Sequence, residues 1–582
     1  MRPVWVIAAA LAVIAAMVMS LWSALNDDVT YALGGIETAA RGGVSVWDVF
    51  VARPVAYRLL MVWLELPVPD GASLTVTELA VRLGADLLVA GSAVALFFGL
   101  RRYLSSGAAG LIAVATGLAL IVAPPWHFLE PDWAAVLVAA LAVGAACAPR
   151  RVWVGAVLGG FAAFLAIGLK LATFPLALLA LLLIGLLDRR RAGWTGLATA
   201  VFTVAWWLAT KQFLPWEGIW LNDQANLVAN SPIHHGIRWE EIHGLLTGLG
   251  DTALISPIVA VAPAAAALLV RRLEPGRRRW AGGVIAVIAT GFSLASAYGQ
   301  GEFFMYHFAA VPVFAAGVWA AAFALCPAAR TPLAVTTAAF AVASFFLLRR
   351  PAEWRLDNVT VITVTYLVVA VVAAVVACSY AGRAARRTPG NVPAPRTTTE
   401  NVTLPAPRTP ADDTAATATR RSRRPASVAV GVVALAAAIV LGNLPKAPFA
   451  FSGYNYRGDN DRPTATGYTA LRERIGADTP VLYLTFGSAN YKLGNPTHCR
   501  YPSPQWLQRG TYVRPVRSTE SYADNLRCLT DDHDARYLVW QPFWFNRMKS
   551  GPQVSSLLQQ QFDCSFEARI PAPKHVVVCP RR

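Results

Sequence analysis

Two adjacent carboxylates, Asp27 and Asp28, directly follow the first apolar stretch of the chain, in the sequence Asn-Asp-Asp-Val-Thr-Tyr-Ala at residues 26–32. Carboxylates this close repel each other, and at the end of an apolar stretch they also lie near a medium of low dielectric constant. Either effect raises the pKa of a carboxyl group and makes its carboxylate a stronger base. The pair therefore indicates a general base, with a helix cap and a solvated acidic loop as the alternative.

A second set of candidate residues is polar and stands at the ends of later apolar stretches: Glu130, Asp132, Lys170, Glu302, Tyr306 and His307. An acid at the start of a membrane helix is costly unless it caps the helix or faces a polar cavity. Glycines within residues 298–307 bring the backbone close to a ligand, beside Tyr306 and His307. We expect this set to bind a substrate. The alternatives are snorkelling to headgroups for Lys170 and a structural role for His307.

Residues 38–67 are amphipathic and rich in aromatic side chains, which predicts one or two helices that lie in the membrane interface without crossing it. Arg53 and Arg58 stand on this stretch. Either arginine can reach a lipid phosphate, and we select Arg58 as the candidate ligand. Snorkelling of both arginines to lipid headgroups is the alternative.

The composition defines the class of protein that must position these residues. Hydrophobic residues make up 55% of the 582 residues and charged residues 15%, whereas soluble proteins carry about 25% charged residues. The mean hydropathy is +0.46. These values exclude a set of soluble domains and also a disordered chain. The net charge of +17 comes largely from short arginine runs between apolar stretches, which is typical of topology-setting charge and excludes a nucleic-acid partner.

Windows of about 20 apolar residues, the length that crosses a bilayer, give about thirteen predicted spans. They lie at 4–25, 79–100, 107–124, 132–148, 152–169, 172–187, 194–214, 252–270, 281–298, 307–325, 331–348, 359–380 and 427–444. With the amino terminus inside, the arginine runs fall on the cytoplasmic side except Arg349-Arg350, and the candidate site residues fall outside. We therefore predict a multi-pass protein of the cell membrane, with the lipid bilayer as a partner and its chemistry on the extracytoplasmic face.

The predicted fold is a polytopic α-helical membrane protein with a C-terminal extracytoplasmic α/β domain. Its parts are a transmembrane catalytic domain at 1–380, a disordered cytoplasmic linker at 381–426, a last transmembrane helix at 427–444 and the α/β domain at 445–582. The linker is rich in Pro, Thr, Ala and Arg and cannot bury a core. Strands are predicted at 481–486, 535–540 and 574–579.

Four cysteines of the C-terminal part, Cys499, Cys528, Cys564 and Cys579, predict two disulfides in an oxidising compartment. Cys564–Cys579 is favoured because the residues between them read as two strands around a turn that contains proline, and Cys499–Cys528 then follows. Zinc is the alternative, but no C-x₂-C pair is present. The histidines and acids of residues 215–250 also match no standard ligand spacing, so no metal or other cofactor is predicted.

With these residues in place, the chain resembles the GT-C superfamily of membrane glycosyltransferases, which use polyprenyl-phosphate sugars as donors. Asp27 to Ala32 resemble the family's Asp-Glu-x-x-Tyr-Ala pattern, with Asp28 in place of Glu. Residues 299–307 are similar to a glycine-rich motif ending in Tyr-His that many actinobacterial members carry. Residues 485–509 resemble actinobacterial cell-envelope members, among them the arabinofuranosyltransferases.

The resemblance implies about thirteen membrane helices in a GT-C-like fold and an inverting transfer. The sugar, a pentose or hexose such as arabinofuranose or mannose, would move from a polyprenyl-phosphate donor to an envelope glycan, glycolipid or protein. By the family pattern Asp27 is the base, and Asp28 tunes it or holds the sugar. The phosphate leaving group needs no general acid. Lys170, His307 and Arg58 would stabilise its charge, and we expect the first two to lie within one phosphate's reach of Asp27.

Two other classes of protein share some of these features. A transporter or lipid flippase would also have many spans, but it usually carries ionisable residues in the middle of its spans and has repeated halves. Here the acids and histidines noted above stand at span ends, and no internal repeat is found. A non-catalytic envelope scaffold would need fewer spans for anchoring.

Overall fold

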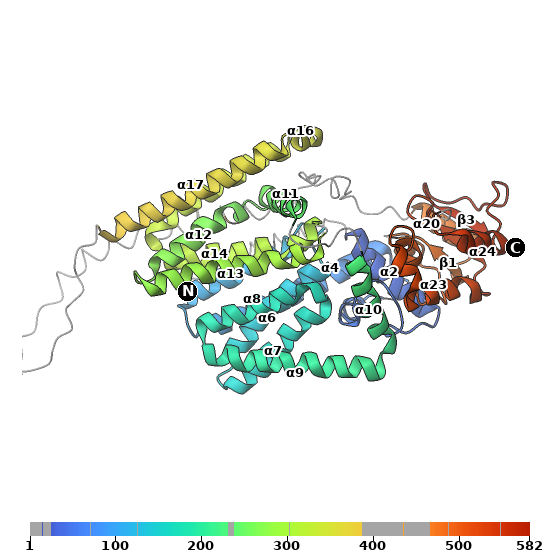
Figure 1. Ribbon diagram of the computed structural model, residues 1–582, viewed down its shortest axis with the longest axis horizontal. Coiled ribbons are helices and arrows are strands. Elements are labelled where there is room, and N and C mark those ends of the chain that lie inside the picture. Colours follow the sequence, from blue (N-terminus) through green and yellow to red (C-terminus); the bar gives the residue numbers. More distant parts are fainter. Residues whose placement is uncertain are drawn as a thin grey trace, which may run out of the picture.

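The computed structural model describes residues 25–386 and 466–582, apart from 70, 125, 231–237, 302, 487 and 547–548, together with residues 14 and 435. The helices of residues 74–386 form a bundle, and the C-terminal residues form a separate mass at one end of it (Figure 1). The predicted spans at 4–25 and 427–444, most of the linker at 381–426 and Glu302 lie outside the described residues. Helix α17 (Val359–Arg386) continues past residue 380, where the linker was predicted to begin.

Each predicted span between residues 79 and 380 overlaps helix in the structure, although the span at 252–270 crosses the break at residues 256–257 between two helices. Seven described helices are long and apolar enough to cross a membrane. They are α4 (Leu74–Leu100), α7 (Val152–Leu169), α9 (Arg189–Phe213), α13 (Arg277–Gln300), η2 (Met305–Phe308) continued by α14 (Ala310–Leu325), η3 (Pro327–Ala329) continued by α15 (Arg330–Leu348), and α17. The helices α11 (Trp239–Ile255) and α12 (Ile258–Arg272) meet at 96° and together make an eighth candidate.

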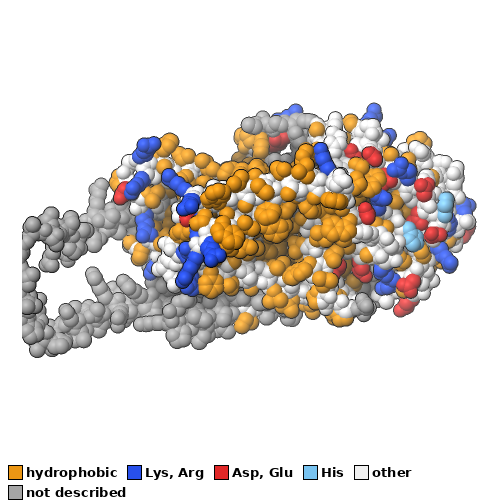
Figure 2. Space-filling view, turned by 90° about the horizontal axis from the view of Figure 1, so that it is seen from below, with side chains coloured by type: hydrophobic (Ala, Val, Ile, Leu, Met, Phe, Trp, Pro, Cys, Tyr) orange, Lys and Arg blue, Asp and Glu red, His pale blue; other side chains and the backbone are white. Residues whose placement is uncertain are grey.

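Three further apolar helices are shorter: α5 (Ser106–Ile121), α6 (Pro131–Cys147) and η1 (Leu171–Thr173) continued by α8 (Phe174–Leu187). By length and composition alone, the described helices therefore supply seven or eight spans, fewer than the thirteen predicted, and the full count stays a prediction. Figure 2 shows hydrophobic side chains over the flank of the bundle, with Lys and Arg gathered at the end remote from the C-terminal mass. Such a surface suits contact with lipid.

Four helices besides these lie before or between the apolar ones: α2 (Asp27–Arg41), α3 (Val55–Glu65), α10 (Pro215–Asn230) and α16 (Ala352–Asp357). Helix α2 begins where Asn26 accepts a hydrogen bond from the backbone N–H of Asp28 at 3.1 Å. Asn26 is thus the N-cap, while Asp27 and Asp28 occupy the first turn, where the helix dipole favours negative charge. Capping of a helix was the alternative role for Asp27 and Asp28, and in the structure Asn26 caps α2 instead.

The described C-terminal residues contain three strands of four residues each, and each overlaps one of the predicted strands. In the order β1-β2-β3, β1 (Val481–Leu484) pairs parallel with β2 (Tyr537–Trp540), which pairs antiparallel with β3 (Val577–Pro580). The surrounding helices are α20 (Thr466–Ile475), α21 (Ala489–Leu493), α22 (Gln505–Arg509), η5 (Arg514–Ser518), α23 (Glu520–Asp531) and α24 (Pro552–Gln561). The sheet is small, and most of this part is helix and loop.

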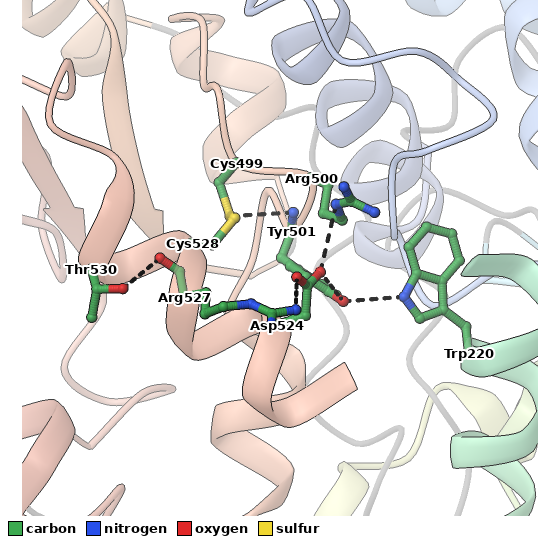
Figure 3. The surroundings of a disulfide bond; sticks show 8 residues. All are labelled: Trp220, Cys499, Arg500, Tyr501, Asp524, Arg527, Cys528 and Thr530. Atoms are coloured by element: carbon green, nitrogen blue, oxygen red, sulfur yellow. Dashed lines mark hydrogen bonds and ion pairs between the residues drawn. A yellow bond between two sulfur atoms is a disulfide. The ribbon is translucent and has the colours of Figure 1, made fainter. Parts of the chain in front are cut away.

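Both predicted disulfides are present, Cys499–Cys528 and Cys564–Cys579. The first joins the loop after α21 to α23. Beside it, Tyr501 donates to Asp524 at 3.0 Å and accepts a hydrogen bond from Trp220 of α10 at 3.2 Å (Figure 3). The disulfide therefore stiffens the place where the C-terminal part meets α10.

The C-terminal part also packs directly on α2. A Cβ atom at Gly34 would collide with the backbone of Tyr491 in α21, and one at Gly42 would collide with the carbonyl of Thr497. Glycine is required at both positions because the two backbones approach so closely. Between them, the N–H of Thr497 donates to the carbonyl of Thr38 at 3.0 Å. These contacts fix α21 against the helix that carries the acidic pair.

Candidate active site

The start of α2 is tied to the loop that carries the second acidic motif. The side-chain amide of Asn26 donates to the carbonyl of Trp126 at 3.1 Å. This contact brings the first turn of α2 beside Glu130, which precedes α6. Two motifs that are about 100 residues apart in the sequence thus meet.

Arg53 joins the two motifs. Its guanidinium lies 2.8 Å from the carboxylate of Asp28 and 3.6 Å from that of Glu130. Ala52, directly before Arg53, and Leu129, directly before Glu130, both have positive φ, at 53° and 65°. Only one other non-glycine residue among those described, His575, shares this conformation. Strained backbone of this kind clusters at functional sites, where the surrounding structure holds it in place.

The Glu130 carboxylate is fully buried, and no described residue donates a hydrogen bond to either of its oxygens. Burial raises the pKa of its carboxyl group, and nearby Asp28 raises it further, while Arg53 and Lys170 oppose this. A buried acceptor without a donor is costly, so Glu130 is placed to accept a hydrogen bond from a bound molecule.

Asp132 lies at the centre of a second group. Lys170 approaches it at 2.8 Å, and Ser296 and Gln300 of α13 each donate to its other oxygen at 3.0 Å. His307 interacts electrostatically with the same carboxylate. The ends of α6, α7 and α13 and the start of α14 therefore converge on one buried acid.

Tyr306 links the two groups. The Lys170 ammonium lies 5.6 Å from the centre of its ring, and the His307 ring packs edge-on against it with centroids 4.4 Å apart. Its hydroxyl interacts electrostatically with Asp28, Glu130, Arg53 and Asp132. The predicted residues Asp28, Glu130, Asp132, Lys170, Tyr306 and His307, together with Arg53, thus form one cluster, which we call the transmembrane-side cluster.

Asp27 faces a different part of the chain. Its side chain is exposed, yet the protein atoms around it reduce its hydration and raise the pKa of its carboxyl group. Lys492 lowers this pKa, Asp28 raises it, and Ser488 lowers it by hydrogen bonding. Both Ser488 and Lys492 belong to the C-terminal part, immediately before and within α21.

Arg58 does not point to the transmembrane-side cluster. Its guanidinium is fully buried, lies 2.9 Å from the carboxylate of Glu217 and donates to the carbonyl of Val49 at 2.8 Å. The second oxygen of Glu217 accepts the N–H of Val55 at the start of α3. This pair fixes α3 to α10 and holds Arg58 beside Glu217, whereas Arg53 lies beside Asp28 and Glu130.

Ionisable residues also extend into one span. Glu78, Arg82 and Asp86 are buried and follow one another at intervals of four along α4. The Arg82 guanidinium lies 4.7 Å from the centre of the Phe128 ring, in the loop before Glu130. These three residues are thus an exception to the concentration of acids and histidines at span ends, and Arg82 contacts the loop that carries Glu130.

Sequence reasoning missed Ser488, Lys492, Ser296 and Gln300 as members of the site. Lys492 lies within residues 485–509, which carried part of the family resemblance, and Gln300 lies within 298–307. Membership of those two segments was the sequence signal that could have pointed to Lys492 and Gln300. Among the described residues, no three His, Cys, Asp or Glu side chains are arranged to hold a metal ion.

No protein-family model matches the sequence, and no curated protein matches it significantly. Two solved structures resemble the chain, both of ArnT from Cupriavidus metallidurans. The one bound to undecaprenyl phosphate has 16% identity and a TM-score of 0.53, and the match covers 100% of this chain and 98% of that chain. The apo structure has 16% identity and a TM-score of 0.49, with 99% and 97% covered. At this identity, the likeness to the structure bound to undecaprenyl phosphate shows that the chain shares its fold with ArnT.

Proposed function

We propose that the protein is an inverting glycosyltransferase that moves a sugar from a polyprenyl-phosphate donor to a hydroxyl group of an acceptor on the extracytoplasmic face of the cell membrane. The observation that carries the proposal is the first turn of α2. There an exposed carboxylate, Asp27, stands next to a buried cluster of cations and carboxylates at the ends of apolar helices. The undecaprenyl phosphate bound in the structural neighbour is itself a polyprenyl phosphate, which supports this donor class.

In the proposed reaction, Asp27 removes the proton of the acceptor hydroxyl as its oxygen forms a bond to the anomeric carbon of the sugar. The bond between that carbon and the phosphate oxygen breaks, and the electron pair leaves with the polyprenyl phosphate. Attack from the face opposite to the leaving group inverts the anomeric centre. One carboxylate suffices, because the leaving phosphate is already a stable anion.

The transmembrane-side cluster would bind the donor headgroup. Arg53 and Lys170 are cations whose side chains are 16% and 21% exposed, so both are accessible to a phosphate while remaining largely shielded from water. Tyr306 and His307 stand beside Lys170 and offer hydrogen-bond donors. Preorganised charges in a partly dry site stabilise a departing anion more strongly than the same charges in water.

Glu130 and Asp28 are suited to the sugar. The oxygens of Glu130 have no hydrogen-bond donor among the described residues, and a sugar hydroxyl supplies one. Asp28 pairs with Arg53, so we assign it to sugar binding and Asp27 to proton removal. We propose a pentose or hexose such as arabinofuranose or mannose, and an envelope glycan, glycolipid or protein as the acceptor.

Purified protein in detergent tests the proposal directly. A panel of polyprenyl-phosphate sugars is offered with envelope glycan acceptors, and both transferred sugar and released polyprenyl phosphate are measured. We expect the wild type to transfer one of them, and Asp27→Asn to transfer it about 10²–10⁴-fold more slowly while still binding donor lipid.

Asp534→Asn, which neutralises an exposed acid of the C-terminal part, is the matched control and should transfer normally. Normal transfer by Asp27→Asn would remove Asp27 as the base. Movement of the intact lipid-linked sugar across vesicles without transfer would indicate a flippase instead.

A further inference from the structure

The first turn of α2 is a border between two sets of neighbours. Asp28 pairs with Arg53, and through it with Glu130 of the transmembrane part. The cation and the hydroxyl that act on Asp27, Lys492 and Ser488, come from a segment more than 450 residues later. Two adjacent carboxylates are thus controlled by opposite ends of the chain.

Helix α21 holds its two site residues rigidly. The N–H of Lys492 donates to the carbonyl of Ser488 at 2.9 Å, so both side chains leave the same turn. Between them Asn490 is fully buried, accepts from Thr485 at 2.6 Å and donates to the carbonyl of Pro502 at 2.6 Å. The Gly34–Tyr491 contact seats this turn on α2.

Other charged and titratable groups face the same place. The Lys492 ammonium lies 5.7 Å from the centre of the Tyr468 ring in α20, and Tyr468 interacts electrostatically with Asp27. Glu78 of α4 acts on Lys492, and Asp28 acts on Asp27. Among the described residues, Lys492 is the cation that acts on Asp27, Asp28 is the adjacent acid, and Glu78 is an acid that acts on Lys492.

We propose that Ser488 and Lys492 are positioning residues for the Asp27 carboxylate, so that the C-terminal part completes the acceptor side of the site. The inference rests on the proposed function and deepens it. Donor phosphate binds on the Arg53 side, and the acceptor hydroxyl reaches Asp27 from the side of α21. The Ser488 hydroxyl orients the carboxylate, and the charge of Lys492 favours the ionised form that can accept a proton.

The test combines Lys492→Met, which keeps length and removes charge, with Lys492→Arg, which keeps charge. Removing the cation raises the pKa of the Asp27 carboxyl group. The acid limb of the pH–rate profile should therefore move to higher pH, and Lys492→Arg should restore it. The KM for the donor should stay unchanged in both variants, and Ser488→Ala should lower kcat. An acid limb that stays in place in Lys492→Met, or an effect confined to the donor KM, would overturn the inference.

A second measurement does not depend on activity. The melting temperatures of Asp27→Asn, Lys492→Met and the double variant form a cycle, and coupled residues give non-additive shifts. Additive shifts would contradict the coupling of Lys492 to Asp27, whether or not the protein transfers sugar. If the shifts are non-additive but the protein transfers no sugar from any polyprenyl-phosphate donor, the coupling stands and the proposed function fails.

Discussion

The two sides of the first turn of α2 differ in how their charges are arranged. On the transmembrane side, Arg53 pairs with Asp28 and Lys170 pairs with Asp132, each at 2.8 Å, and these side chains are largely buried. On the C-terminal side, Asp27 is exposed and Lys492 acts on it without such a direct pair among the described residues. Fixed, buried pairs suit a phosphate that always binds in one place. An exposed carboxylate suits a base that must meet an incoming neutral hydroxyl and take up its proton.

Of the variants considered, Lys170→Met should lower the stability of the transmembrane side most. Asp132 would be left buried without its cation, which costs up to about 3–5 kcal/mol of unfolding free energy, less some relief because Lys170 is 21% exposed. Unfolding of the purified protein in detergent measures the loss. Lys211→Met, which changes a lysine whose ammonium lies over Trp207, is the control.

The double variant Lys170→Met/Asp132→Asn separates folding from donor binding. It should regain most of the stability, because the unpaired charge is gone, but it should bind polyprenyl phosphate about tenfold or more weakly, as expected when one charged contact is lost. Donor binding at the wild-type level would refute the phosphate role of Lys170.

Replacing Cys499 and Cys528 together by serine should weaken the C-terminal side. Loss of a native disulfide typically costs about 2–5 kcal/mol, and this one stiffens the contact with α10. Thermal unfolding measures the change, and Cys326→Ser, at a free cysteine, serves as the reference. Alkylation mapping that finds all four C-terminal cysteines reactive in the wild type would contradict the disulfides and the oxidising compartment.

Gly34→Ala should separate the two sides without removing a charge. The new methyl group collides with the Tyr491 backbone and pushes α21 from α2, at a cost of about 1–3 kcal/mol. Transfer should fall while donor-lipid binding stays normal, because the transmembrane-side cluster is untouched. Gly91→Ala in α4, where a Cβ meets open space, should change neither quantity. Equal losses of binding and transfer in Gly34→Ala would show that the two sides are not independent.

Asp28→Asn should have the smallest effect. The amide still accepts a hydrogen bond from Arg53, and only the charge-assisted part of the contact is lost, about 1–1.5 kcal/mol or roughly tenfold in rate. Transfer kinetics beside Asp27→Asn measure the difference. A larger loss in Asp28→Asn than in Asp27→Asn would exchange the roles of the two acids.

Much of the architecture was predictable because apolar length is a strong local signal. The predicted spans between residues 79 and 380 overlap helices, the three strands overlap the predicted ones, and both disulfides join the predicted cysteines. Glu130, Asp132, Lys170, Tyr306 and His307 come together because each stands at the end of an apolar stretch. The domain boundaries and the number of spans in the membrane remain predictions.

The choice between Arg53 and Arg58 was not predictable from pattern. Both stand on one amphipathic stretch, and which arginine faces the site depends on where the helix begins. Helix α3 starts at Val55, which leaves Arg53 in a loop behind a strained Ala52 and buries Arg58 beside Glu217. The role of Lys492 was hidden for a related reason, since it depends on docking between two ends of the chain and not on any local period.

The contacts between α2 and the C-terminal part can form only late in the synthesis of the chain. Arg41 donates to the carbonyls of Ala477 and Gly494, and His498 lies 2.8 Å from the carbonyl of Gly42, a sequence separation of 456 residues. At a synthesis rate of roughly 5–20 residues per second, α2 waits about 20–90 seconds for these partners. An unfinished chain can already hold its bundle helices, but its Asp27 lacks Ser488 and Lys492. Termination of synthesis after α17 but before residue 488 therefore leaves a chain with all its described bundle helices but without Ser488 and Lys492 beside Asp27.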